Sequence, residues 1–184
     1  ALVDPNDMPP ETLTQDPYVA RQFGEDAEYE AVHMWEEHFQ VSTRLSRDKY
    51  SAIDFMGFPS DLYSPHFVQV KARSVWSTYF ENFKIDLKGY NRLVSLQDIT
   101  KYDVFLFIIF TDKSGYINIP IRQAAPEEKG PETNLATSAL YFPVSYLRWI
   151  PDDRFRSYFP SGGWKKYLPK EEKLPPYVSY ESSF

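Results

Sequence analysis

A glutamate on a predicted helix is the first residue whose type and position could serve chemistry. Residues 18–39 have a helical pattern, and on a wheel of about 100° per residue Glu28 falls on the apolar arc, between Trp35 and Phe39. An unpaired carboxylate is costly to bury, so Glu28 should have a cation, a hydrogen-bond donor or water beside it. An ion pair at the rim of the core, or the exposed end of the helix, is the ordinary alternative.

Two strand-like segments carry the other candidate residues. Asp54 lies within the segment 51–55, although Asp is disfavoured in strands. In the segment 67–73 side chains alternate between faces, so Gln69 and Lys71 are neighbours on one polar face. Each segment also has a plain structural explanation. The aspartate could cap the following turn, and the second segment could be an ordinary amphipathic strand.

Taken together, these residues come in the order that a divalent-metal nuclease site requires. Carboxylate oxygens hold Mg²⁺ or Mn²⁺, and Mg²⁺ keeps several waters and binds substrate phosphate. A lysine such as Lys71 can orient or deprotonate the attacking water and stabilise charge on the phosphate. Such a site needs neither cysteine nor many histidines, and the chain has no cysteine and three histidines.

The elements that must position these residues follow from periodicity. In chain order, we predict a helix at 18–39, strands at 39–43, 51–55 and 66–73, a helix at 88–97, strands at 104–110 and 116–121, a polar loop at 122–138, a strand at 139–144 and a short helix at 145–149. The run 104–110 is continuously apolar, as in a strand buried on both faces. This order predicts a mixed α/β sandwich around one sheet.

The 184 residues suit one domain with extensions. We predict an extended N-terminal arm at 1–18, which holds four prolines, and an α/β domain at 19–150. A C-terminal extension at 151–184, rich in proline and aromatic residues, would pack on the domain or on a partner. Within it, residues 162–170 interleave aromatic and cationic residues, which suits either nucleic-acid contact or packing.

The composition excludes several classes of protein. With 26 acidic and 20 basic residues, the chain has a formal net charge of -6, which argues against a basic nucleic-acid coat. Without cysteine it can form no disulfide and no thiolate metal site. No apolar run reaches the length of a membrane helix, and the acidic, proline-containing residues 1–15 do not resemble a signal peptide. We therefore expect a cytoplasmic protein.

Three short motifs resemble the PD-(D/E)xK nuclease superfamily: residues 24–28, residues 53–55 and residues 68–73. The order of elements over about residues 20–121 resembles the αβββαβ core of the restriction-endonuclease-like fold, with a mixed central sheet flanked by helices. The Gly-x-x-x-Glu start of the first helix is similar to that of archaeal Holliday-junction resolvases and related restriction-type domains.

The resemblance implies a role for each matching residue. Asp54 would be the principal metal ligand, and Glu28 a metal ligand or a ligand through water. Gln69 would be the second ligand, with the Val70 backbone carbonyl beside it, and Lys71 the catalytic lysine. The family usually has Glu or Asp at position 69, although Gln-x-Lys variants are a recognised subset. Because a neutral amide binds Mg²⁺ more weakly than a carboxylate, Glu28 would supply the second negative charge.

The resemblance also implies a nucleic-acid partner, DNA in the first place and RNA as an alternative, and a homodimer if both strands are cut. Lys88 and Arg92 on the second helix, and Arg73 beside Lys71, are the expected phosphate contacts. A solvated helix face explains the first two equally well, and Arg73 could instead pair with Glu28 or Asp54. Two rival functions stay open. One is a non-catalytic nucleic-acid or protein-binding module that keeps the nuclease fold, and the other is a structural or assembly protein.

Overall fold

The computed structural model describes residues 8–13, 16–48, 51–60, 64–121, 125–127 and 138–167. Within them the helices are α1 (Pro17–Phe39), α2 (Leu87–Thr100) and α3 (Asp152–Tyr158), with 3-10 helices η2 (Val144–Tyr146) and η3 (Gly163–Tyr167). The strands are β1 (Ser42–Leu45), β2 (Phe55–Phe58), β3 (His66–Ala72), β4 (Asn82–Asp86), β5 (Val104–Ile109), β6 (Ser114–Asn118), β7 (Ala125–Glu127), β8 (Ala139–Pro143) and β9 (Arg148–Trp149).

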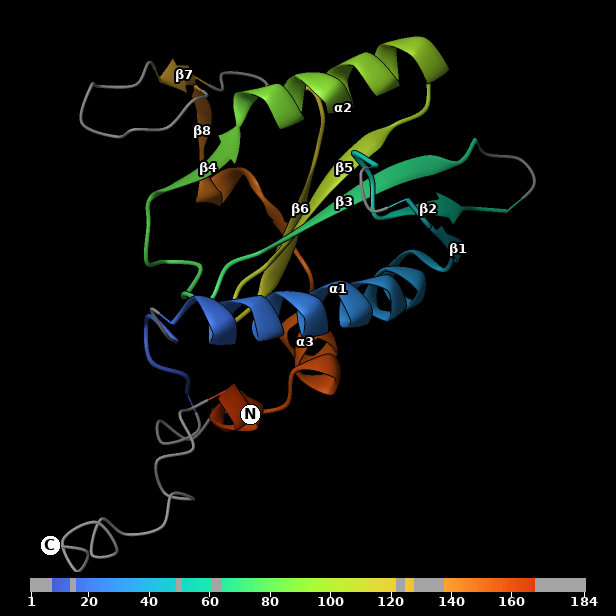
Figure 1. Ribbon diagram of the computed structural model, residues 1–184. Coiled ribbons are helices and arrows are strands. Elements are labelled where there is room, and N and C mark those ends of the chain that lie inside the picture. The colour runs from blue at the N-terminus through green and yellow to red at the C-terminus, as the bar shows by residue number, and fades with distance from the viewer. Residues whose placement is uncertain are drawn as a thin grey trace, which may run out of the picture.

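The described strands form two sheets. The larger one has the order β1-β2-β3-β5-β6-β9, in which β3 and β5 are parallel and the other neighbours antiparallel. The smaller sheet has the order β4-β8-β7. Helices α1 and α2 cover opposite faces of the larger sheet (Figure 1). The predicted fold class is therefore confirmed: a mixed α/β domain whose mixed central sheet is flanked by helices, consistent with a restriction-endonuclease-like fold.

Strand β5 is buried on both faces, as its continuous apolar run predicted. Phe107 and Ile109 belong to the core under α1, whereas Leu106 and Ile108 belong to the core under α2. Strand β3 divides in the same way, because Val68 packs in the first core and Phe67 in the second. By alternation Gln69 and Lys71 stand on the α2 face of the sheet.

Helix α1 begins and ends with recognisable caps. Asp16 precedes it and accepts a 2.9 Å hydrogen bond from the Tyr18 amide, while Pro17 occupies the first helical position. Gln40 ends the helix in the left-handed conformation, with φ 52°. The buried stripe of the helix consists of Val19, Phe23, Ala27, Ala31, Val32, Met34 and Trp35. Trp35, which the wheel places on the apolar arc, belongs to this stripe, whereas Phe39 is partly buried.

Several elements differ from the sequence-based prediction. The predicted helix at 145–149 is wrong, because Arg148 and Trp149 form β9 after a single 3-10 turn. Strand β9 pairs with β6, where Gly115 opposes Trp149 and a Cβ on Gly115 would lie 2.9 Å from the indole. Strand β4 and helix α3 were not predicted. Strand β7 lies inside the predicted loop 122–138, of which residues 122–124 and 128–137 fall outside the described part of the chain.

The segments at the two ends of the described chain pack on the domain. In the N-terminal segment, Leu13 N donates to Ser74 O at 2.8 Å, and Glu11 O accepts from Trp76 N at 2.8 Å. At the other end, α3 and η3 lie against α1 (Figure 1). The Tyr167 hydroxyl donates to the Asp26 carboxylate. Lys166 Nζ lies 3.2 Å from the same group, so this aromatic and cationic segment contacts the protein's own helix.

No described helix combines the length and the apolar character needed to cross a membrane.

Candidate active site

Asp54 occupies a bend directly before β2, not the strand interior that its sequence context predicted. Its backbone is held on both sides: the Asp54 amide donates to Val68 O at 2.9 Å, and its carbonyl accepts from Ser46 N at 2.9 Å. The amide of Val70 then donates a 2.7 Å hydrogen bond to Asp54 Oδ2. The carboxylate is therefore fixed against β3.

This arrangement depends on how far β2 runs along β3. The register pairs Phe55 with Val68 and Gly57 with His66, so β2 ends at the middle of β3. The second half of β3 keeps β5 on one side, where Gln69 faces Leu106 and Lys71 faces Ile108. On the other side of residues 69–72 no strand is paired, and the side chain of Asp54 lies there instead. We call this unpaired side the open edge of β3 (residues 69–72).

Gln69 has a buried side-chain oxygen, Oε1, without a hydrogen-bond partner among the described residues. A buried unsatisfied polar atom costs about 1–3 kcal/mol, and native structures hold few of them. An amide oxygen is also a ligand that Mg²⁺ and Ca²⁺ accept. The orphaned oxygen therefore fits a cation bound beside the open edge.

Lys71 stands half-buried among carboxylates from three different elements. Burial lowers the pKa of its ammonium group, and the nearby Arg73 charge lowers it further. Asp54, Asp86 and Glu28 act in the opposite direction and raise the pKa. The amine of Lys71 is thus placed between Asp54 at the start of β2, Glu28 on α1 and Asp86 at the start of α2.

Glu28 is exposed, so its predicted burial on the apolar face of α1 is wrong. The residue follows Ala27 at the margin of the buried stripe, where the carboxylate can reach solvent. It nevertheless faces the same site: partial desolvation raises its pKa first, the charges of Asp54 and Glu25 raise it further, and Lys71 lowers it. Glu28 and Asp54 are therefore close enough to repel each other.

The pKa of the Asp54 carboxyl group is also shifted by its surroundings. Burial raises the pKa of its carboxyl group, while the hydrogen bond from Val70 and the charge of Lys71 lower it. Two carboxylates with raised pKa, one amide oxygen without a partner and one lysine form a donor set that a divalent cation would suit. No group of three or more His, Cys, Asp or Glu side chains within the described residues could hold a metal, so a cation here would depend on Gln69 and water.

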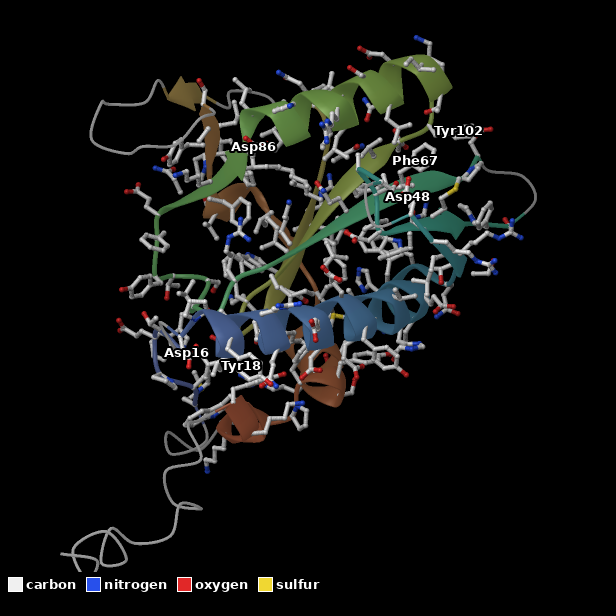
Figure 2. All side chains as sticks on the ribbon, in the orientation of Figure 1. Asp16, Tyr18, Asp48, Phe67, Asp86 and Tyr102 are labelled. Atoms are coloured by element: carbon white, nitrogen blue, oxygen red, sulfur yellow. The ribbon has the colours of Figure 1, made fainter. Side chains whose placement is uncertain are left out.

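Asp86 is the residue of this neighbourhood that the sequence analysis missed. Its Oδ2 accepts a 2.9 Å hydrogen bond from Gly89 N, which caps α2. Figure 2 places Asp86 at the junction of β4 and α2. An aspartate before a helical pattern is a recognisable cap signal. Nothing in the sequence, however, indicated that β4 would bring it near Lys71.

The three residues expected to contact phosphate do not lie together in the structure. Lys88 and Arg92 are exposed on α2 and line an open groove of about 770 Å³, which Ser51 and Ile53 line from the segment before Asp54. Arg73 is engaged elsewhere: its guanidinium donates to the backbone carbonyls of Ala72 at 2.9 Å and Lys84 at 3.3 Å. Within the described residues Arg73 forms no ion pair with Glu28 or Asp54.

Comparisons with known proteins place the chain only by its fold. No protein-family model matches the sequence, and no curated protein matches it. Among solved structures, a similar one is Hjc, a Holliday junction resolvase from the archaeal hyperthermophile Archaeoglobus fulgidus. The similarity covers 64% of this chain and 88% of the resolvase, at 9% sequence identity and a TM-score of 0.43. At that level the fold assignment rests on the sheet order, and the activity has to be argued from the site.

Proposed function

We propose that the protein is a divalent-metal-dependent nuclease that hydrolyses phosphodiester bonds, with DNA as its substrate. The observation that carries this proposal is the convergence of Glu28, Asp54 and Lys71 beside the unpartnered Gln69 Oε1. Each group has a task in phosphodiester hydrolysis, and in the metal-free protein the arrangement carries a desolvation cost and a repulsion that a bound cation would relieve.

Asp54, Glu28 and Gln69 would hold Mg²⁺ or Mn²⁺, with the Val70 carbonyl as a further candidate ligand. When bound, the metal supplies Lewis-acid activation of water and of the scissile phosphate. The Val70 amide keeps the Asp54 carboxylate oriented. Lys71, with its lowered pKa, would orient the attacking water or take its proton, and as an ammonium group it would stabilise charge on the phosphate.

The substrate would lie along the groove beside α2. Lys88 and Arg92 line this groove, and it borders the segment that leads into Asp54. Phosphates attracted by these two cations would therefore lie next to the proposed metal ligands. A homodimer, needed if both strands are cut together, and a cytoplasmic location stay predictions.

A cleavage assay tests the proposal. Purified protein is incubated with Mg²⁺ or Mn²⁺ and supercoiled plasmid, a four-way junction or single-stranded DNA, next to the variant Asp54→Asn. The matched control is Asp152→Asn, which removes one carboxylate from the exposed start of α3. We expect metal-dependent cleavage by the wild type and the control and none by Asp54→Asn. Cleavage that survives in Asp54→Asn would contradict the proposal.

A non-catalytic module with the same fold is the second candidate function. It is favoured by one observation: position 69 is a neutral Gln, so Lys71 is left to balance Asp54 and Glu28. For this candidate we expect nucleic-acid or protein binding that is unchanged by EDTA, and no cleavage of any substrate. RNA cleavage would keep the nuclease site and change only the substrate.

A further inference from the structure

A second cavity lies just beyond the open edge of β3, and the proposed reaction does not use it. It has a volume of about 340 Å³ and is lined mainly by aromatic and cationic side chains. The lining residues that matter here are Arg73, Trp76, Phe80, Asn82, Phe83 and Lys84. We call this cavity the aromatic pocket.

The inner walls of the aromatic pocket are held in place. Trp76 Nε1 donates a 2.9 Å hydrogen bond to Pro9 O, and its backbone amide donates to Glu11 O. The Arg73 guanidinium lies 4.7 Å from the centroid of the Phe83 ring. Phe83 itself is buried. These contacts give the pocket a rigid aromatic wall before any ligand arrives.

The rim of the pocket carries an exposed aromatic side chain next to polar ones. Phe80 is 59% exposed, and Tyr79 packs edge-to-face against it at 4.7 Å between ring centroids. Phe80 lines the pocket and is held by its neighbour Tyr79, so it offers an exposed ring on which another ring can stack. Lys84 and Asn82 are exposed beside them and add a cation and an amide.

The chemistry of this lining matches a nucleobase attached to its phosphates. Aromatic rings stack on any base, cations attract the backbone, and an amide can hydrogen-bond to a base edge. The volume lies at the lower end of small-ligand sites, so the pocket suits one planar group and not a duplex. A base can enter it only after leaving its stack.

The pocket also continues from the proposed active site along one strand. Arg73 follows Lys71 by two residues on the same face of the chain, which corresponds to about 7 Å along a β-strand. Stacked nucleotides of one strand are spaced by about 3.4 Å. Unstacked nucleotides are spaced farther apart than this, so a base in the pocket would belong to a nucleotide at most about two steps from the phosphate at Lys71.

We infer that the aromatic pocket binds one unstacked base of the substrate, within about two nucleotides of the cleaved bond. This inference rests on the proposed nuclease function and deepens it. Substrates with an unpaired nucleotide near the cleavage site (single strands, flaps or mismatches) are bound and cut in preference to intact duplex. Phe80 and Trp76 are binding residues in this scheme and take no part in the chemistry.

Binding of base-containing and base-free strands tests the inference. In the Asp54→Asn background, which prevents cleavage, anisotropy compares short fluorescent oligothymidylate with an abasic oligomer of equal length and charge. We expect the parent to prefer the base-containing strand, and Phe80→Ala to lower that preference by about fivefold or more. Phe80→Tyr should restore it. The matched control is Tyr29→Ala, which removes another exposed aromatic side chain, on α1, whose ring contacts His33.

The outcomes separate this inference from the proposed function. If Phe80→Ala keeps the full preference for base-containing DNA with an unchanged thermal midpoint, the inference is wrong, and the pocket is open to a protein partner instead. Cleavage by the wild-type protein would then still support the nuclease. If the preference depends on Phe80 but the wild type cuts nothing, the pocket stands and the nuclease proposal fails.

Discussion

The backbone amide of Val70 and the carboxylate of Asp54 are joined by a 2.7 Å hydrogen bond, and this bond turns Asp54 toward the open edge of β3. It forms because β2 begins at Phe55, opposite Val68 of β3, which leaves the Val70 amide without a strand partner on that side. One side chain thus takes the place of a ladder bond. The same interruption leaves this edge of β3 unpaired beside Gln69 and Lys71.

Asp54→Asn should separate catalysis from folding. The variant keeps a side-chain oxygen that can accept from Val70 but loses the negative charge, so metal-dependent cleavage should fall by about 100-fold or more. Because the pKa of Asp54 is raised in the folded protein, the ionised carboxylate opposes folding at neutral pH, and the thermal midpoint should stay equal or rise. Single-turnover cleavage and thermal unfolding check the two effects. A large fall in the midpoint would assign Asp54 a structural role.

Two substitutions of Gln69 should change metal binding in opposite directions, because one removes the Oε1 atom and the other gives it a negative charge. Gln69→Leu removes the unpartnered Oε1, so the free energy of unfolding should rise by up to about 1–3 kcal/mol while metal-dependent activity is lost. Gln69→Glu should bind Mg²⁺ more tightly, and its thermal midpoint should depend more strongly on the metal concentration. Calorimetric titration with Mg²⁺ measures the affinity. Equal Mg²⁺ affinity in all three proteins would remove Gln69 from the ligand set.

The part of the candidate site that the sequence can predict is the part with a local pattern. Gln69 and Lys71 share one face of β3 because the side chains of a strand alternate, and Val68 and Val70 pack in the core on its other face. The prediction that Glu28 is buried was wrong because a helical wheel gives the direction of a side chain and does not show which part of that face the rest of the fold covers. Asp86 was missed because its approach to Lys71 depends on β4, a contact far apart in the chain.

The same difference between local patterns and long-range contacts explains which elements of the fold could be predicted. The apolar run of β5 and the stripe of α1 carry enough hydrophobic signal to be recognised alone. Strand β4 has only two buried residues, Phe83 and Ile85, and owes its existence to pairing with β8. Helix α3 has a single buried residue, Phe155, whose ring stacks on Phe159 at 5.1 Å between centroids. Tertiary contacts therefore determine whether such short segments form a strand or a helix.

Charge reversal in the groove beside α2 should weaken DNA binding without changing the fold. Lys88→Glu and Arg92→Glu each remove one phosphate contact, so the slope of log affinity against log salt should fall by about 0.9 per contact on duplex DNA. Arg148→Glu on β9 is the matched control, because Arg148 is exposed but lies outside this groove. The measurement is the DNA affinity of the wild type and of each variant at several salt concentrations. An unchanged slope would place the DNA elsewhere.

Gly57 should tolerate no side chain, because the imidazole of His66 occupies the space beside it. A Cβ on Gly57 would lie 2.2 Å from His66 Nε2, and that ring is held by a hydrogen bond from Trp35. Gly57→Ala should therefore lower the free energy of unfolding by about 1–3 kcal/mol, the usual cost of overpacking. Gly24→Ala is the control, since a Cβ there meets no atom within 4 Å. Denaturant unfolding compares the two variants.

His66 should make stability depend on pH. Trp35 Nε1 donates a 2.8 Å hydrogen bond to His66 Nε2, which requires that nitrogen to be unprotonated. Burial lowers the pKa of His66 below its usual 6.5, with the charge of Asp103 partly opposing the shift. As pH falls below about 6.5, the unfolded chain binds the proton first, so the free energy of unfolding decreases; above that pH this contribution is fully present and constant.

The variant His66→Gln isolates this contribution, since Gln can still accept from Trp35 but does not titrate. The comparison is needed because burial also lowers the pKa of His38, whereas the raised pKa of Asp54 changes stability with pH in the opposite direction. Relative to His66→Gln, the wild type should lose stability below pH 6.5 with a slope approaching about 1.4 kcal/mol per pH unit. Denaturant unfolding at a series of pH values supplies both curves. Parallel curves would show that His66 carries its proton in the folded protein as readily as in the unfolded chain.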